Sequence, residues 1–195
     1  MSNNKPETRQ RLVSSAADMI SRRGLDATSI RELAKYAKVP LGSTYHYFPG
    51  GKQQVAVEAI QYAGDNVAHL LQQALEAGPI AGLHSFLDLW RSRVKQSHFQ
   101  AGCPVLAVAT EEPTDEVGLA TLEAASEVFS KWRSLLAESL IKHGAEKAQA
   151  NSIATLAVAS VEGSVALCRA HRSLQPLDEI EQLLDELMGQ AISQH

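Results

Sequence analysis

The sequence predicts an all-α protein with two helical domains. Apolar residues recur at three- and four-residue intervals along most of the 195 residues, and this spacing places them on one face of a helix. No stretch shows the sustained alternation of β-branched and aromatic residues that is typical of a strand. Glycine and proline interrupt the helical pattern and define the elements that follow.

Three short helices are expected first, over residues 8–23, 29–37 and 41–48. Two arginines followed by Gly24 suit the C-terminus of the first helix. Ser29 with Glu32 fits a capping box at the start of the second, whereas Thr28 as the cap would face Arg31 instead. The short connection between the second and third helices has the length found in a helix-turn-helix motif. The residues expected to pack the three helices together are Leu12, Ile20, Ile30, Leu33, Val39 and Phe48.

A larger helical region is expected after the Pro49-Gly50-Gly51 break. A long helix begins at Lys52 and runs to about Ala77. The later helices are expected at about 80–98, 103–111, 116–143, 147–171 and 177–193. We therefore expect an N-terminal domain over residues 1–52 and a C-terminal domain over residues 53–195.

The charge is unevenly distributed along the chain. The whole chain has a formal net charge of −4. Residues 1–60 carry nine basic and five acidic side chains, a net charge of +4, and the remainder carries nine and seventeen, a net charge of −8. A basic end on an acidic body favours a polyanionic partner such as nucleic acid, although a difference of this size also arises by chance.

Hydropathy argues against a membrane partner and for a cytoplasmic location. A membrane span needs roughly 20 consecutive apolar residues, and no stretch here approaches that. The first residues also lack the apolar core of a signal peptide.

The candidate functional element is the third short helix. Four of the ten aromatic residues, Tyr36, Tyr45, Tyr47 and Phe48, fall in or near it. Thr44 and Phe48 are expected to face inward, and Gly42, Ser43, Tyr45 and His46 outward. Small residues at the start of a reading helix allow close approach to base edges, and longer polar side chains reach phosphates. The alternative is that Tyr45 and Tyr47 are half-buried helix aromatics.

Other chemistry finds little support, and we expect no catalytic residue, no metal site and no cofactor. The seven histidines and two cysteines show no zinc-ligand spacing. Gly51-Lys52 lacks the other positions of a phosphate-binding loop. The pair Glu111-Glu112 before Pro113 is expected to be solvated at a helix end.

A ligand pocket in the larger domain is harder to read. The candidate lining residues are Phe86, Trp90, Phe99, Cys103, Phe129 and Trp132, because pockets favour large apolar side chains. Ordinary core packing is the alternative for each of them. Cys103 and Cys168 are expected to be small buried residues, and a redox sensor would instead need a low thiol pKa.

The motif residues resemble the DNA-binding domain of the tetracycline-repressor (TetR) family. The resemblance rests on Thr28-Ser-Ile-Arg-Glu-Leu-Ala34, on Val39-Pro-Leu-Gly-Ser-Thr-Tyr-His-Tyr-Phe48 and on Lys52. Pro49-Gly-Gly-Lys52 and Gly102-Cys-Pro-Val-Leu-Ala107 are similar to the subgroup with the LmrA- and QdoR-type repressors. Three positions depart from the common pattern: Lys38 where many members have glycine, Leu41 where a basic residue is frequent, and Thr44 in place of an aliphatic residue.

This resemblance implies a homodimeric repressor that binds a palindromic operator in double-stranded DNA. It also implies release by a small-molecule effector, here apolar or aromatic, and dimerisation through the two C-terminal helices. The DNA-contacting residues implied in this sequence are Thr28, Ser29, Arg31, Lys38, Leu41, Gly42, Ser43, Tyr45, His46 and Lys52. A helical protein-interaction adaptor and a helical enzyme are the alternatives.

Overall fold

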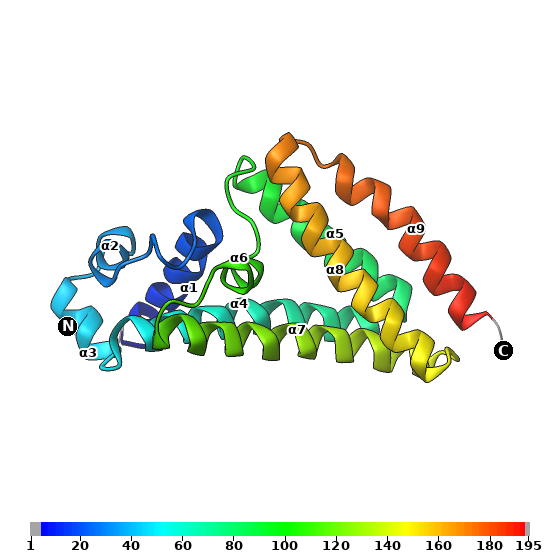
Figure 1. Cartoon of the computed structure of the whole chain (residues 1–195), viewed down its shortest axis with the longest axis horizontal. Helices are drawn as coiled ribbons and strands as arrows, with labels where there is room; N and C mark the ends of the chain where they lie inside the picture. The colour runs from blue at the N-terminus through cyan, green and yellow to red at the C-terminus, as the bar shows by residue number, and fades with distance from the viewer. Residues whose placement is uncertain (1–4, 194–195) are drawn as a thin grey trace. The chain divides into compact units, whose positions relative to one another are not determined.

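Helices form all the regular secondary structure of residues 5–193, the range that the computed structural model describes. The fold is all-α, as the sequence predicts. The helices in this range are α1 (Lys5–Arg23), α2 (Ile30–Tyr36), α3 (Leu41–Tyr47), α4 (Gly51–Leu75), α5 (Pro79–Gln96), α6 (Pro104–Thr110), α7 (Glu116–Lys142), α8 (Lys147–His171) and α9 (Gln175–Ile192) (Figure 1).

The observed helix bounds differ from the expected ones by at most three residues, the largest difference being the start of α1 at Lys5. Periodicity places the last helix after Pro176, but α9 begins at Gln175 and includes this proline in its first turn. Pro79 and Pro104 occupy the first turns of α5 and α6 in the same way. Proline is tolerated there because the N–H groups of the first turn have no partner within the helix.

The chain divides into two compact units. The first runs to Gly64 and also includes Cys103–Val128, and the second contains Asp65–Gly102 and the chain from Phe129 onward. The first unit therefore holds the three short helices, α6 and the opening parts of α4 and α7. The domain boundary expected at residue 52 falls in the first turn of α4 and stays a prediction.

The first unit is built around α1. This helix packs against α2 and α6, and α2 packs in turn against α3 (Figure 1). The expected core residues Leu12, Ile20, Leu33, Val39 and Phe48 are buried, and the sixth, at position 30, is half-buried. The apolar pattern of the short helices therefore identified the residues that hold this unit together.

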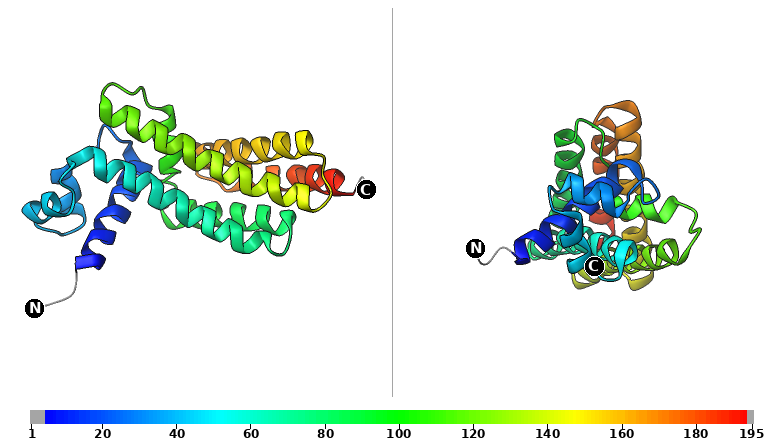
Figure 2. Two further views of the ribbon diagram at one scale, coloured as in Figure 1. Left: turned by 90° about the horizontal axis from the view of Figure 1, so that it is seen from below. Right: turned by 90° about the vertical axis from the view of Figure 1, so that its left-hand side faces the viewer.

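The second unit contains α5, α8 and α9, which pack against one another. The pair α8 and α9 runs antiparallel, side by side (Figures 1 and 2). Arg91 of α5 joins α9 through ion pairs to Asp178 at 2.9 Å and Glu181 at 2.6 Å. His84, also on α5, lies 2.8 Å from Asp185 of α9. These contacts join α9 to α5 along one side of α9.

By length and composition, α8 is apolar enough to cross a membrane, so the expectation that no stretch approaches this length was wrong. Half of its most apolar 18-residue window is buried inside the protein, and a core helix of a soluble protein has the same properties. Much of its apolar character is therefore explained by packing within the second unit.

Candidate nucleic-acid interface

The start of α2 is fixed by Ser29. Its backbone is extended, with φ −112° and ψ 155°, and its hydroxyl oxygen accepts a hydrogen bond from the Glu32 backbone N–H at 3.2 Å. The hydroxyl also donates to the Glu32 carboxylate at 3.1 Å. The predicted Ser29 cap is thereby confirmed. Thr28 instead is buried, and its hydroxyl donates to the Gly24 carbonyl at 2.8 Å.

The turn between α2 and α3 is left-handed at Lys38. Its φ is +54°, and the following Val39 N–H donates to the Ala34 carbonyl at 2.9 Å, closing the end of α2. A non-glycine residue in this conformation costs on the order of 1 kcal/mol. The Lys38 side chain is exposed, so its cation is available beside the start of α3.

The third helix has an inner and an outer face. Thr44 and Phe48 are completely buried, as expected. We call Gly42, Ser43, Tyr45 and His46 the α3 outer face; Ser43 is half-buried and the other three are exposed. Tyr45 is 54% exposed, whereas Tyr47 is half-buried with its ring edge-on to His46 at 5.6 Å. Leu41, at the start of the helix, is 38% exposed.

Gly42 has no steric role within the described protein. A Cβ added there would meet no atom within 4 Å, and the residue is not among those with positive φ. Neither the packing nor the backbone conformation of residues 5–193 therefore requires a glycine here, and its missing side chain leaves a flat surface at the start of α3. Such a surface allows another molecule to approach the backbone closely.

The start of α4 lies beside the start of α2. Lys52 lines a small depression together with Thr28, Ser29 and apolar residues of α1, α2 and α4. It lies in the first turn of α4, where the free backbone N–H groups also attract anions. The structure thus brings three predicted DNA-contacting residues to one place.

Sequence reasoning missed a network that fixes the turn between α3 and α4. The Gly50 N–H donates to the Gln54 side chain at 3.0 Å, and Gln54 donates to Glu58 at 3.0 Å. Arg9 of α1 pairs with Glu58 at 2.6 Å and lies over the Phe48 ring, 5.0 Å from its centroid. Arg9 and Glu58 are 49 residues apart, so no local pattern could have revealed this pair.

A second missed cluster joins α1 to α2. Asp18 accepts hydrogen bonds from Arg22 at 2.8 Å and from the Tyr36 hydroxyl. The hydrogen bond to Asp18, followed by burial, raises the pKa of Tyr36. The same carboxylate raises the pKa of Arg22. This cluster links α1 to α2 through the Tyr36 hydroxyl.

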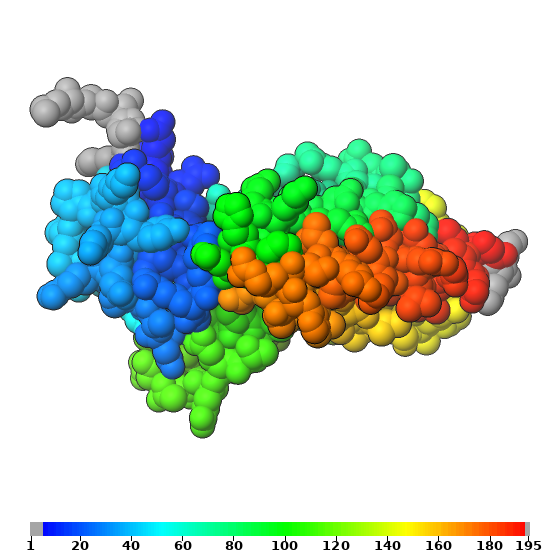
Figure 3. Space-filling view, turned by 90° about the horizontal axis from the view of Figure 1, so that it is seen from above, coloured from blue at the N-terminus to red at the C-terminus, as the bar shows by residue number. Residues whose placement is uncertain are grey.

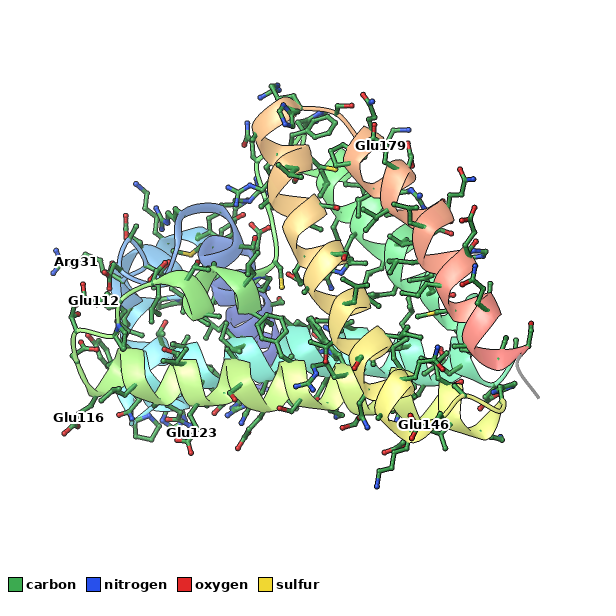
Figure 4. All side chains as sticks on the ribbon, turned by 45° about the vertical axis from the view of Figure 1, so that its right-hand side comes forward. Arg31, Glu112, Glu116, Glu123, Glu146 and Glu179 are labelled. Atoms are coloured by element: carbon green, nitrogen blue, oxygen red, sulfur yellow. The ribbon has the colours of Figure 1, made fainter. Side chains whose placement is uncertain are left out.

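The basic side chains of the first unit differ in availability. Arg9, Arg22 and Arg23 form ion pairs with carboxylates inside the unit. Arg31, in contrast, extends from α2 away from the ribbon (Figure 4), and Lys38, in the turn after α2, is exposed. Arg31 and Lys38 are thus exposed basic residues of this unit, as are Arg11 and Lys35, which the sequence analysis did not name.

The candidate ligand-lining aromatics form a packed cluster in the second unit. Phe86, Trp90 and Trp132 are fully buried. The Phe86 ring meets the Trp90 and Trp132 rings edge-on, with centroids 6.4 Å and 5.7 Å apart. Phe129 is half-buried and meets Trp132 at 5.6 Å. These four residues are brought together, and whether any of them lines a ligand pocket stays a prediction.

The other two candidates lie elsewhere in the chain. Phe99 is half-buried in the α5–α6 connection, with a φ of +62°. Cys103 is buried at the start of α6, where its sulfur accepts from the Leu106 N–H at 3.5 Å. Burial raises the pKa of the Cys168 thiol, which is opposite to what a redox sensor needs.

Comparison with known proteins agrees with this arrangement of helices. Residues 12–59 match the family described as bacterial regulatory proteins, tetR family. Residues 79–183 match the family described as transcriptional regulator LmrA/YxaF-like, C-terminal domain. The two matches together cover the helix-turn-helix motif and most of the helices after it.

Relatives match over nearly the full chain. An uncharacterised HTH-type transcriptional regulator of Mycobacterium tuberculosis is 38% identical over 183 residues, which are 92% of this chain and 93% of that protein. The HTH-type transcriptional regulator LmrA of Bacillus subtilis is 27% identical over 93% of this chain and 97% of its own. The crystal structure of a TetR transcriptional regulator from Legionella pneumophila has the same fold, with a TM-score of 0.83, 20% identity, and coverage of 95% of this chain and 97% of that one.

These matches identify a regulator and not an enzyme. The family and the named relatives are transcriptional regulators with a DNA-binding helix-turn-helix domain. The chain therefore belongs to the TetR family of bacterial transcriptional regulators, with a C-terminal domain of the LmrA/YxaF-like type.

Proposed function

We propose that the protein is a homodimeric repressor that binds a palindromic operator and is released by a small-molecule effector. The observation that carries this proposal is the α3 outer face. It is open to solvent while the opposite side of the same short helix is anchored in the core. A reading helix needs this combination of a rigid inner side and a free, polar outer side. Such a repressor acts in the cytoplasm, where its operator lies.

The α3 outer face suits the major groove of DNA. Gly42 lets the helix start approach base edges, and Ser43 offers a hydroxyl to a base edge or phosphate. Tyr45 and His46 reach toward the phosphates, and Leu41 can contact a thymine methyl group.

The flanking residues would hold the protein on the DNA backbone. Arg31, Lys38 and Lys52 supply positive charge, and the N-terminus of α4 supplies backbone N–H groups. Ser29 and Thr28 would lie beside them at the start of α2. Thr28 is buried and already donates its hydroxyl proton to the Gly24 carbonyl, so it would contact a phosphate only after that hydroxyl turns away from the carbonyl.

Dimerisation through α8 and α9 is supported by apolar residues that the chain leaves uncovered. On α8, Leu156 and Leu167 are 48% and 49% exposed and lie three turns apart on one face. On α9, Leu183 is 67% exposed, and Figure 3 shows this helix open on its outer side. A second copy of the chain would cover these exposed leucines, as expected for an obligate dimer.

Effector binding is supported by an unpaired donor inside the aromatic cluster. The indole N–H of Trp90 is buried and has no hydrogen-bond partner among the described residues. A buried donor without a partner is costly, and a ligand with an apolar or aromatic body and one acceptor atom would satisfy it. Binding would favour a dimer whose reading helices no longer match the operator, where half-sites lie roughly 34–36 Å apart.

Operator binding is tested with Tyr45→Phe and Lys52→Ala. The probe is a labelled duplex from the region upstream of the protein's own gene, against a scrambled duplex of equal composition. If the hydroxyl holds a phosphate, Tyr45→Phe weakens binding by about tenfold or more, because hydrogen bonds to charged groups contribute about 1.5–3 kcal/mol. Lys52→Ala lowers the slope of log affinity against log salt by about one.

Matched controls are available in the same chain. Tyr62→Phe, on α4, and Lys142→Ala, at the end of α7, make the same chemical changes outside the proposed interface and are expected to leave binding unchanged. Equal binding of the operator and scrambled duplexes would refute the repressor proposal. A monomeric protein at the concentrations of the assay would refute the dimeric part.

A further inference from the structure

The carboxylate of Glu111 reaches the DNA-binding helices from the segment after α6. Glu111 and Glu112 are expected to form a solvated pair, but only Glu112 is exposed, as Figure 4 shows where it labels this residue. The Leu25 backbone N–H donates to both oxygens of Glu111, at 2.9 Å and 3.1 Å. The two residues are 86 positions apart. The expectation was therefore wrong for Glu111.

Leu25 needs an acceptor because it follows the end of α1 and is buried. The preceding Gly24 takes a φ of +83° and closes the helix through a hydrogen bond to the Ile20 carbonyl at 2.9 Å. Leu25 is only 5% exposed, so its N–H is shielded from water and requires a protein partner. Charged acceptors make the stronger hydrogen bonds, and Glu111 supplies one here against the unfavourable dipole at the end of α1.

Both the contact with Glu111 and the turn require glycine at position 24. A Cβ at this position would lie 2.0 Å from a Glu111 carboxylate oxygen. The glycine is therefore required twice, once for its positive φ and once for space beside the carboxylate. Its role as a helix cap, which the sequence predicts, explains only the first requirement.

The turn held by Glu111 leads directly into α2. The Thr28 N–H donates to the Leu25 carbonyl at 3.0 Å, and the Thr28 hydroxyl donates to Gly24. Ser29, the next residue, caps α2, and α2 packs against α3. The segment that carries Glu111 also packs along α1 through α6. The carboxylate thus lies where the direction of the reading helices is set.

We propose that Glu111 is a positioning residue for operator binding, which holds the turn between α1 and α2 so that α3 is presented in its binding orientation. This inference rests on the proposed operator binding. Without the carboxylate, the Leu25 N–H loses its acceptor and the turn samples other conformations. The apparent dissociation constant for the operator then rises, because it is inversely proportional to the fraction of protein in the binding-competent conformation.

Electrostatics alone predicts the opposite change in DNA affinity, so the experiment distinguishes the two effects. Removing a carboxylate from a DNA-binding protein reduces repulsion of the phosphates and by itself tightens binding. Glu112→Ala, the matched control, is therefore expected to bind the upstream duplex as well as the wild type or slightly better. Glu111→Ala is expected to bind about tenfold more weakly, with an unchanged salt slope because no phosphate contact is lost.

Two further variants separate this role from general stability. Glu111→Gln keeps an acceptor oxygen at the same reach and is expected to stay within about threefold of the wild type. Glu111→Asp keeps the charge but shortens the side chain, so it is expected to bind as weakly as Glu111→Ala. Hydrogen exchange of the peptide that contains Leu25 is expected to quicken in Glu111→Ala and not in Glu112→Ala.

The outcomes distinguish the two proposals. If the wild type does not prefer the operator duplex, the proposed function fails and this inference fails with it. If the wild type prefers the operator and Glu111→Ala binds like Glu112→Ala, the positioning role alone is refuted. If Glu111→Ala does not fold, the comparison of Glu111→Asp with Glu111→Gln decides, and equal affinities for these two refute the role.

Discussion

Replacement of Phe86 by alanine tests whether the aromatic cluster is structural core or ligand pocket. Phe86 is fully buried and makes edge-on contacts with both tryptophan rings. Removing a buried phenylalanine side chain costs about 3–5 kcal/mol when the cavity does not collapse. Since each aromatic pair contributes about 0.5–1.5 kcal/mol beyond burial, we expect a loss in the upper part of that range.

Phe129→Ala is the matched comparison in the same cluster. Its ring is half-buried and meets only Trp132 among the described ring contacts. Half the burial and one ring contact predict a loss of about 1–2 kcal/mol. Phe86→Ala is therefore expected to cost at least twice as much as Phe129→Ala.

Thermal and urea unfolding followed by tryptophan fluorescence measure this difference. The chain has two tryptophans, and both lie in the cluster, so the signal reports on it directly. For a chain of this size each kcal/mol lowers Tm by roughly 2–4 °C. We expect Tm to fall by about 8–20 °C for Phe86→Ala and by about 2–8 °C for Phe129→Ala, at one fixed protein concentration because a dimer's stability depends on it.

A small effect would refute this reasoning. If Phe86→Ala unfolds within about 1 kcal/mol of the wild type, its ring does not support the core. If the same variant also loses its response to effector, the ring lines the pocket instead.

Two further predictions concern the first unit. Ser29→Ala removes the cap of α2 and is expected to lower the free energy of unfolding by about 1 kcal/mol, measured by urea unfolding, with Ser29→Asp restoring it; an unchanged midpoint would contradict the cap. The raised pKa of Tyr36, caused first by its hydrogen bond to Asp18, means that its stabilisation is fully present below about pH 10, the ordinary tyrosine value, and is lost as pH rises through the folded-state pKa. Unfolding curves of the wild type and Tyr36→Phe are therefore expected to converge at alkaline pH, and a difference that persists there would show that the hydroxyl does not act through Asp18.

Local features of the interface were predictable because they depend on neighbouring residues. The Ser29 cap, the two faces of α3 and the burial of Thr44 follow from spacings of three or four residues, which helix geometry determines. The left-handed backbone at Lys38 could not be predicted from the sequence, because a glycine would have indicated it and this chain has a lysine there. Its φ of +54° comes from the structure.

The aromatic residues show where sequence reasoning stops. Their size and apolar character made Phe86 and Trp90 candidate pocket residues, but core and pocket residues have the same composition. Burial and ring contacts depend on which helices meet, and the unpaired Trp90 N–H is visible only once every neighbour is placed.

The sequence by itself determined the all-α fold, the helix-turn-helix and the family. The fold follows from the three- and four-residue spacing of apolar residues, and the other two follow from a motif of nearly contiguous residues. Only the tertiary structure decided how the DNA-binding helices are held. Glu58 pairs with Arg9, and Glu111 accepts from the Leu25 amide, across separations at which sequence carries no pairing rule. The physical reason is that a carboxylate has no intrinsic partner. Its role is set by whichever buried donor the packed helices bring within hydrogen-bonding distance.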